Sequence, residues 1–179
     1  MTMHKPLPSR RRGFTLIEVM VALVILAVGL LGMASLMARS QKSNESAYAR
    51  SQATLLAYDI IERMRTNLVD PDPAANKNYK VLYVTDHSSK YSLGSLPSCS
   101  APTGAPPAGG ESRATYDIAA WCSALRSSLP SVDAAGTSVA FDTSALATTG
   151  VVKVTVQVQW RDNSIDGGEN QNVTLVTSL

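Results

Sequence analysis

An uncharged apolar run near the N-terminus constrains the fold of this chain more than any other feature. Every residue from 19 to 34 is apolar or glycine, and only Ser35 interrupts the run before it ends at Ala38. As an α-helix, residues 14–38 would extend roughly 37 Å at 1.5 Å per residue, which is long enough to cross a bilayer with some tilt. The sequence therefore predicts a membrane-spanning helix.

One carboxylate lies inside the start of this segment, at Glu18. An ionisable side chain at the centre of a bilayer costs about 2.5–3.5 kcal/mol on insertion scales, and less near the interface. Ionisable residues inside membrane segments usually have a functional role. We therefore expect Glu18 to be paired with a positive charge when the chain performs its function.

Basic residues before the run orient the helix. Lys5 and three consecutive arginines, Arg10, Arg11 and Arg12, precede it, and an excess of positive charge marks the cytoplasmic side of a membrane helix. The bulk of the chain is then exported. These residues also account for the formal net charge of +2. The remainder is close to neutral, which argues against a nucleic-acid-binding surface.

A cleaved signal peptide is the ordinary alternative. Its apolar region would have about 7–15 residues and would end at a small-residue cleavage site. The run here is longer, it contains an acid near its start, and the sequence Ala34, Ser35, Leu36 fits such a site poorly. We therefore do not expect conventional cleavage.

The residues around Glu18 carry a family resemblance. A short basic leader ends at Gly13 and is followed by Phe14, Thr15, two apolar residues and Glu18. This arrangement resembles the class III leader of type IV pilins and related pseudopilins. The resemblance implies cleavage after Gly13 by a prepilin peptidase on the cytoplasmic face, and N-methylation of the new amino terminus at Phe14. It also implies that Glu18 pairs with the Phe14 amino group of a neighbouring subunit during filament assembly. The alternative is a generic signal anchor with an incidental glutamate.

The helical pattern continues beyond the membrane segment to Asn67. Apolar residues recur at helical spacing along one face: Ala53, Leu56, Ala57, Ile60, Ile61, Met64 and Leu68. Charged residues occupy the other face: Arg50, Asp59, Glu62, Arg63 and Arg65. We therefore divide the chain into a cytoplasmic leader (1–13), the transmembrane or filament-core half of one long helix (14–38), its amphipathic half (39–67) and a periplasmic head (68–179).

The end of this helix resembles one particular type of pilin. Residues 59–67 are similar to the corresponding segment of PilV-type minor pilins, with an acidic residue, an apolar pair and Glu-Arg-Met-Arg. The same residues also describe an exposed helix face on which Glu and Arg stand at supporting spacings. The choice of PilV type therefore depends on the resemblance and not on the charges.

The first part of the head contains fewer regular patterns. Residues 81–84 are expected to form a short strand. Thr115 is expected to cap a second helix, with Asp117 in its first turn and Pro130 closing it. The apolar stripe of this helix contains Ile118, Trp121, Cys122, Leu125 and Leu129.

The chain has two cysteines, Cys99 and Cys122, and both lie on the exported side of the membrane segment. In an oxidising compartment we favour a disulfide bond between them over two free thiols. Such a bond would tie a loop to the second helix.

The C-terminal third reads as antiparallel sheet. Val139 and Phe141 indicate a short strand, and the apolar side chains of residues 151–160 alternate strictly. A turn at 162–170 leads to a return strand with Val173, Leu175, Thr177 and Leu179. The expected fold is therefore α+β and type IV pilin-like. A long N-terminal helix, transmembrane in its first half, packs against a small antiparallel sheet with one additional short helix.

No catalytic or cofactor-binding motif stands out. His87 is the only histidine outside the leader, and nucleophile-elbow, dinucleotide-binding, P-loop and zinc-protease motifs are absent from the sequence. Asp162, Ser164 and Asp166 match the first half of a calcium loop, but Val173 stands where a bidentate glutamate is required. A hairpin turn explains the same residues. We therefore expect no enzyme activity, cofactor or metal, and the scattered aromatic residues do not favour nucleic-acid binding.

These features predict an exported, membrane-anchored minor pilin of PilV type. The resemblance implies that it joins other minor pilins in a complex that primes polymerisation of the major pilin near the pilus tip, with a tip adhesin as a further partner. It would reside in the inner membrane with its head in the periplasm, and then in the surface pilus. The nearest alternative is a minor pseudopilin of a type II secretion system, which shares the leader. A membrane-anchored periplasmic enzyme is more remote.

Overall fold

The computed structural model describes residues 13–67, 90–108, 110–149, 151–163 and 168–179. The chain divides into two compact units, Met1–Gln41 and Lys42–Leu179. The strand predicted at residues 81–84 and His87 lie outside the described residues.

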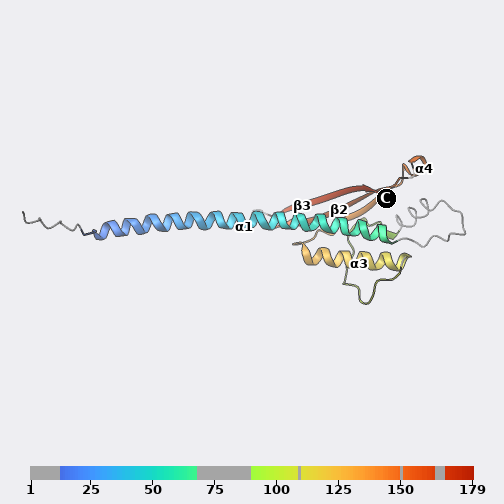
Figure 1. The fold of residues 1–179 in the computed structure, drawn as a ribbon, viewed down its shortest axis with the longest axis horizontal. Coiled ribbons are helices and arrows are strands. Elements are labelled where there is room, and N and C mark those ends of the chain that lie inside the picture. The colour runs from blue at the N-terminus through green and yellow to red at the C-terminus, as the bar shows by residue number, and fades with distance from the viewer. Residues whose placement is uncertain (1–12, 68–89, 109, 150, 164–167) are drawn as a thin grey trace, which may run out of the picture. The chain divides into compact units, whose positions relative to one another are not determined.

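A long helix, α1 (Leu16–Thr66), runs through 51 residues and contributes to both units (Figure 1). No proline interrupts this part of the sequence, so every backbone N–H in the helix interior can donate. By length and composition, α1 is the one helix within the described residues that is apolar enough to cross a membrane. The predicted membrane segment is therefore helical from Leu16 onward.

In the second unit, α1 turns one face toward the core of the head. The buried residues recur three or four positions apart, as the sequence predicted: Ala49, Ala53, Ala57, Ile60, Ile61 and Met64. Leu56 is half-buried, and Leu68 lies outside the described residues. The helix ends at Thr66, and the backbone N–H of Asn67 still donates to the Arg63 carbonyl at 2.9 Å.

The second helix of the head, α3 (Gly110–Ser128), begins earlier than the sequence predicted. Thr115 is not its cap, because it lies inside the helix and its hydroxyl donates to the Glu111 carbonyl at 3.0 Å. Asp117 is therefore not in the first turn. The residues before Thr115 are mostly polar, so they carry no apolar periodicity that would have marked the start. The predicted stripe is otherwise confirmed, with Ile118 half-buried and the remaining members buried: Trp121, Cys122, Leu125 and Leu129.

Three strands form one antiparallel sheet within the described residues, in the order β1 (Ser138–Asp142), β2 (Lys153–Asp162) and β3 (Glu169–Ser178). The central strand β2 buries alternate side chains, as its pattern predicted: Val154, Val156, Val158 and Trp160. In the register of the sheet, Val156 is paired with Val139 of β1 and Leu175 of β3.

Two connections in the sheet differ from the sequence expectation. The hairpin turn is shorter than predicted, because β2 extends to Asp162 and β3 begins at Glu169, its partner in the register. Gly168 has a φ of 65°, a conformation that favours glycine. The sequence also gave no sign of the short helix α4 (Leu146–Thr149), which lies between β1 and β2.

Side chains from α1, α3 and the sheet form the core of the head. Its largest fully buried side chains include Trp121 from α3, Trp160 from β2, and Tyr91 from the segment before α3. The expected α+β class, with a long N-terminal helix, an antiparallel sheet and an additional helix, is confirmed.

Candidate functional site

The segment that precedes α1 is accessible. Phe14 is 84% exposed, and Gly13 is exposed as well. No described atom lies within 4 Å of the place where a Cβ atom of Gly13 would stand. Gly13 is also not among the described glycines with positive φ. Neither crowding nor backbone conformation within the described chain therefore requires glycine at this position.

Glu18 lies in the first turn of α1, and its side chain is exposed. The Thr15 carbonyl accepts the first helical hydrogen bonds, from the N–H of Glu18 at 3.1 Å and of Val19 at 3.4 Å. Thr15 and Glu18 have the Thr-x-x-Glu spacing of a capping box, and an acid in the first turn is favoured by the helix dipole. Glu18 therefore has a local reason to be here besides any contact with another molecule.

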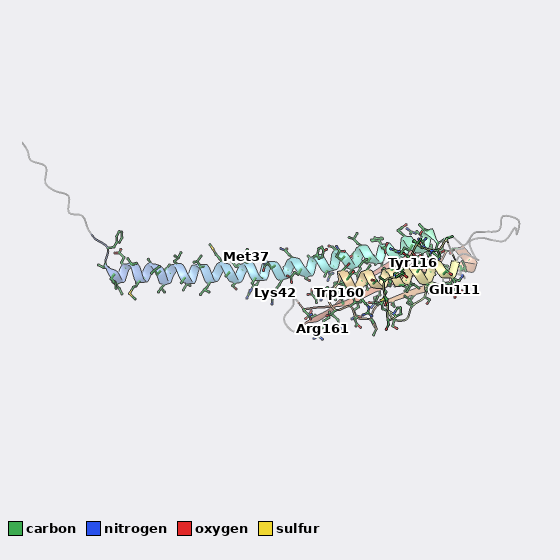
Figure 2. The ribbon with its side chains drawn as sticks, turned by 90° about the horizontal axis from the view of Figure 1, so that it is seen from below. Met37, Lys42, Glu111, Tyr116, Trp160 and Arg161 are labelled. Atoms are coloured by element: carbon green, nitrogen blue, oxygen red, sulfur yellow. A yellow bond between two sulfur atoms is a disulfide. The ribbon has the colours of Figure 1, made fainter. Side chains whose placement is uncertain are left out.

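The apolar surface of α1 in the first unit is not covered by the described chain. Its large apolar side chains, from Phe14 to Met37, are between 50% and 84% exposed. Figure 2 shows side chains projecting to both sides of this part of α1, as far as the labelled Met37. Full burial of one such side chain is worth about 1.5–3 kcal/mol, so this surface requires lipid or other apolar helices around it.

Comparison with known protein families bears directly on this segment. Residues 8–34 match the family model of the prokaryotic N-terminal methylation motif. The chain carries the leader motif of type IV pilins and pseudopilins. Comparisons with curated proteins and with solved structures found no match.

The prepilin motif bears on how the chain is processed, assembled and anchored. A class III prepilin leader implies processing by a prepilin peptidase and assembly with other pilins. The motif and the apolar helix behind it fit a protein anchored in the inner membrane. The long helix and the antiparallel sheet of the head give the chain a pilin-like architecture.

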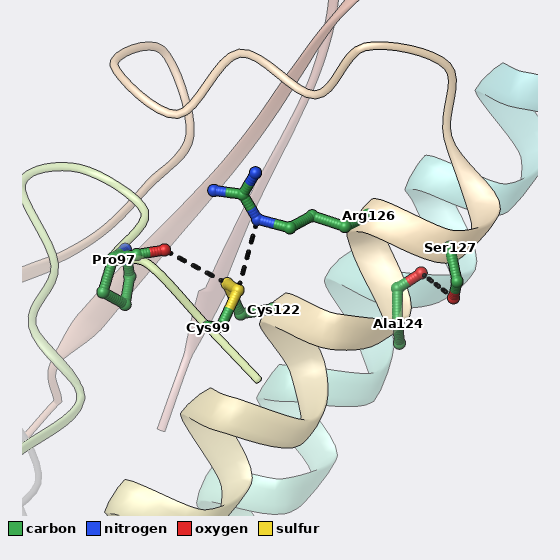
Figure 3. The surroundings of a disulfide bond; sticks show 6 residues. All are labelled: Pro97, Cys99, Cys122, Ala124, Arg126 and Ser127. Atoms are coloured by element: carbon green, nitrogen blue, oxygen red, sulfur yellow. Dashed lines mark hydrogen bonds between the residues drawn. A yellow bond between two sulfur atoms is a disulfide. The ribbon is translucent and has the colours of Figure 1, made fainter. Parts of the chain in front are cut away.

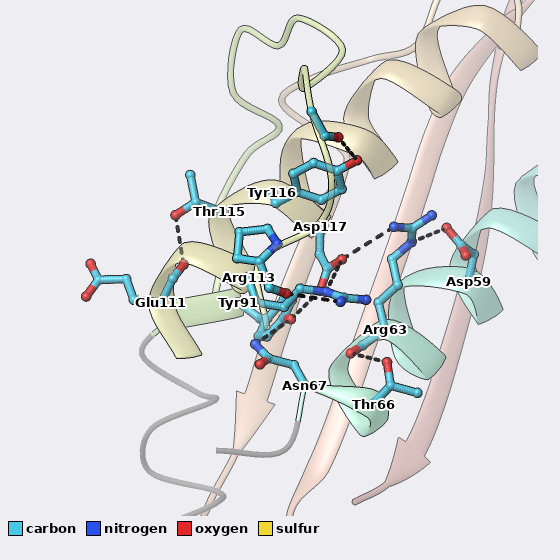
Figure 4. A network of polar contacts seen from close by, with 12 residues as sticks. Asp59, Arg63, Thr66, Asn67, Tyr91, Glu111, Arg113, Thr115, Tyr116 and Asp117 are labelled. Atoms are coloured by element: carbon cyan, nitrogen blue, oxygen red, sulfur yellow. Dashed lines mark hydrogen bonds and ion pairs between the residues drawn. The ribbon is translucent and has the colours of Figure 1, made fainter. Parts of the chain in front are cut away.

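A polar network joins α1 to α3 inside this pilin-like head (Figure 4). At its centre, the carboxylate of Asp117 is fully buried. Nε of Arg113 donates to both carboxylate oxygens at 3.1 Å, and Nη1 of Arg63 donates to Oδ1 at 3.4 Å. The Tyr91 hydroxyl donates to Oδ2 at 2.8 Å. Two arginines and a tyrosine thus compensate one buried negative charge.

Further hydrogen bonds extend this contact along α1. Nε of Arg63 donates to Asp59 at 2.7 Å, and Nδ2 of Asn67 donates to the Tyr91 hydroxyl at 2.9 Å. One turn further along α3, Nε1 of Trp121 donates to the Leu56 carbonyl at 2.7 Å. The last turns of α1 are therefore fixed to α3 by side chains as well as by packing.

The network shifts the titration of two of its members. Burial and the hydrogen bond donated to Asp117 raise the pKa of Tyr91. Desolvation lowers the pKa of Arg63, but its hydrogen bond to Asp59 and the charges of Asp59 and Asp117 outweigh that effect and raise it overall. Both groups are thereby held in the protonated state, in which they donate.

The sequence did not predict this network. Arg63 and Asp59 were assigned to an exposed face of α1, and Asp117 to a helix start. Two of the three partners of Asp117, Arg63 and Tyr91, lie 54 and 26 residues away in the sequence, and only tertiary structure brings them to it. The spacing of Arg113 and Asp117, one helical turn apart, was the one local signal available.

The two cysteines form a disulfide bond in the structure, with their Cα atoms 5.9 Å apart. This is the pairing favoured from the sequence. The bond ties the segment before α3 to the core side of that helix, and a bridge over a loop of this size contributes about 3 kcal/mol in the chain-entropy model.

The calcium-loop candidates are only partly described. Asp162 is buried at the end of β2, and Ser164 and Asp166 lie outside the described residues. Within the described ranges, no group of three or more His, Cys, Asp or Glu side chains could hold a metal ion. The sequence analysis expected a hairpin turn rather than a calcium site at these residues, and that expectation stays a prediction.

The face of α1 that points away from the head core also carries apolar side chains. Tyr48, Leu55 and Tyr58 are 64%, 62% and 52% exposed. At 3.6 residues per turn they fall on one side of the helix, opposite the buried Ala53 and Ala57. The second unit therefore has an apolar stripe of its own that the described chain does not cover.

Proposed function

We propose that this chain is a minor pilin of PilV type that joins other minor pilins in a complex priming type IV pilus assembly near the pilus tip. The observation that carries the proposal is the N-terminal segment. It combines an exposed Gly13–Phe14 bond, Glu18 at the start of α1 and an uncovered apolar helix within a prepilin motif. The assignment to PilV type is supported by the resemblance of residues 59–67.

Leader cleavage would create the partner of Glu18. Removal of residues 1–13 frees an amino group at Phe14, two residues before Leu16, where α1 begins. An opposite charge within about 4–6 Å favours an ionised carboxylate, and loss of one partner of a buried pair costs about 3–5 kcal/mol. A pair between the Phe14 amino group and Glu18 of neighbouring subunits would therefore favour one stagger of adjacent helices over others.

The location and partners follow from the same proposal. The apolar part of α1 sits first in the inner membrane, with the head in the periplasm, and then among the helices of other minor pilins and the major pilin. The stripe of Tyr48, Leu55 and Tyr58 is a separate exposed apolar surface on α1 in the second unit, and it supports contact with a neighbouring subunit. A tip adhesin is proposed as a further partner. The work of the chain is assembly and not catalysis.

A charge-specific variant tests the proposal at Glu18. Glu18→Gln keeps the capping box, since Gln serves at that position as well as Glu, but it removes the charge. We expect Glu18→Gln, like Glu18→Ala and Glu18→Lys, to reduce the amount of this chain in sheared pili by at least about tenfold while its level in the membrane is unchanged.

Thr15→Ala is the matched control. It weakens the cap by about 0.5–2 kcal/mol and leaves the charge of Glu18 in place, so incorporation should persist. Normal incorporation of Glu18→Gln would refute the charge pair, and equal loss in Thr15→Ala would assign Glu18 to helix capping.

Deletion of the gene separates the pilus from the secretion system, because the leader is common to both. Surface pili, twitching motility and exoprotein release are scored in the same strain. The proposal predicts loss of pili and twitching with normal release. Loss of release with normal pili would instead identify a minor pseudopilin, and a periplasmic enzyme predicts that all three persist.

A further inference from the structure

The two sulfur atoms of the disulfide differ in how far solvent can reach them. Cys122 is fully buried on the core face of α3, between the buried residues Trp121 and Leu125. Cys99 is half-buried in the segment before α3. Because Cys122 has no exposed surface, an external reagent has access to the disulfide only from the side of Cys99.

The polar groups beside the two sulfur atoms also differ in charge: one is a cationic guanidinium and the other is a carbonyl oxygen (Figure 3). Nε of Arg126, in the last turn of α3, lies 3.3 Å from Sγ of Cys99 and points a cationic N–H at it. The Pro97 carbonyl oxygen lies 3.4 Å from Sγ of Cys122. If these neighbours keep their places in the reduced protein, a guanidinium beside Cys99 would favour a thiolate there, and a carbonyl beside Cys122 would accept a hydrogen bond from a neutral thiol.

We propose that Cys99, and not Cys122, is the sulfur that exchanges with an external disulfide when this bond forms, and that Arg126 activates it. The thiolate of Cys99 attacks a disulfide R–S–S–R, forms a mixed Cys99–S–S–R bond and expels one thiolate, RS⁻. Cys122 then loses its proton to solvent and attacks Sγ of Cys99, which expels a second RS⁻. The two cysteines lose two electrons, and the external disulfide gains them as two thiols.

The same asymmetry slows the reverse reaction. A reducing thiolate can reach only Cys99, and its attack must expel Cys122 as a thiolate into the core. A leaving thiol with a high pKa leaves slowly, so the buried and uncompensated position of Cys122 protects the completed bond. The proposal therefore predicts slow reduction of the completed bond by an external thiolate.

The test uses the reduced full-length chain in detergent micelles. A short pulse of oxidised glutathione is quenched with acid, and the glutathione adducts are located by peptide mass spectrometry. We expect the adduct on Cys99 to exceed that on Cys122 by about tenfold or more. In denaturant the preference should disappear, because it depends on folded neighbours. Equal labelling in the native protein, or preference for Cys122, would overturn the proposal.

Single-cysteine variants remove the second exchange step and separate reactivity from trapping. Cys122→Ser retains Cys99, and Cys99→Ser retains Cys122. Their circular dichroism is compared with that of the reduced wild type. We expect Cys99 in the first variant to react with oxidised glutathione about tenfold faster than Cys122 in the second. Similar rates in two folded variants would overturn the proposal.

The role of Arg126 is tested in the Cys122→Ser background. Arg126→Gln should slow the reaction of Cys99 about fivefold, whereas Arg126→Lys should retain most of the rate because it keeps the positive charge. Lys153→Gln is the matched control, since it removes one exposed positive charge from the start of β2. Equal effects of Arg126→Gln and Lys153→Gln would exclude a local role for Arg126.

Discussion

Asp117 illustrates how this head accommodates a buried charge. Its carboxylate has no exposure, and two arginines and a tyrosine hydroxyl surround it within 3.4 Å. Arg63 and Arg113 keep 30% and 25% of their side-chain surface exposed. The negative charge is therefore fully removed from water, while its positive partners remain partly hydrated, which limits the total cost of burial.

Removal of this carboxylate should be costly. Asp117→Ala leaves three donors without their acceptor, so we expect the free energy of unfolding to fall by about 3 kcal/mol. Denaturant unfolding in detergent measures it through tryptophan fluorescence, since both tryptophans are buried in the head. Glu111→Gln, an exposed change on the same helix, should stay within about 0.5 kcal/mol. A similarly small effect of Asp117→Ala would contradict a compensated ion cluster.

Tyr91 should make the head sensitive to alkaline pH. Its pKa is raised in the folded state above the ordinary value of 10.0, so its stabilisation is complete below pH 10.0 and is lost as the pH rises from there toward the folded pKa. The loss amounts to about 1.4 kcal/mol per pH unit. Tyr91→Phe lacks this ionisation, so its stability difference from the wild type should shrink in unfolding experiments from about pH 10 to about pH 11. A constant difference would contradict the raised pKa.

The segment that resembles PilV-type pilins has an internal role. Asp59, Arg63 and Asn67 all take part in the contact between α1 and α3. Glu62 and Arg65 form an ion pair on the exposed side. Part of the resemblance is therefore explained by stabilisation of the head. Only the exposed residues of this segment are available to contact another protein.

Among the secondary-structure elements, those with a repeating burial pattern were predictable. The alternation along β2 and the stripe along α1 follow from one buried face on a regular backbone. The start of α3 was missed because its first turns are polar, and α4 was missed because four residues carry no period. The leader motif was predictable because its residues lie together in the sequence, whereas Arg63 and Tyr91, two of the three partners of Asp117, are distant from it in the sequence.

The buried face of α1 in the second unit should dominate the stability of the head. Ile60 is 1% exposed in the core, and Ile60→Ala should lower the free energy of unfolding by about 2–5 kcal/mol. Leu55, at 62% exposure on the opposite face, is the matched control, and Leu55→Ala should stay within about 0.5 kcal/mol. Denaturant unfolding compares the two variants. Equal losses would contradict the orientation of α1 against the head.

The helix α1 carries apolar surfaces in both units, and the chain itself covers only one of them. In the first unit α1 is apolar and uncovered, and in the second unit one of its faces is buried by the head that the chain itself provides. Within the second unit, the Asp117 network fixes α3 to the last turns of α1, and the disulfide fixes the segment before α3 to that helix. In the described part of the first unit, residues 13–41, no part of the chain covers the apolar side chains, so the proposed function assigns this surface to lipid and then to neighbouring helices.

Leader removal is the step that would convert this chain from a membrane protein into a filament subunit. The direct measurement is the mass of the N-terminal peptide of this chain, recovered from sheared surface pili. We expect a peptide that begins at Phe14 and carries one methyl group on its amino nitrogen. A chain that retains residues 1–13, that begins at another residue, or that is present in the membrane but absent from the pili would contradict the proposed role.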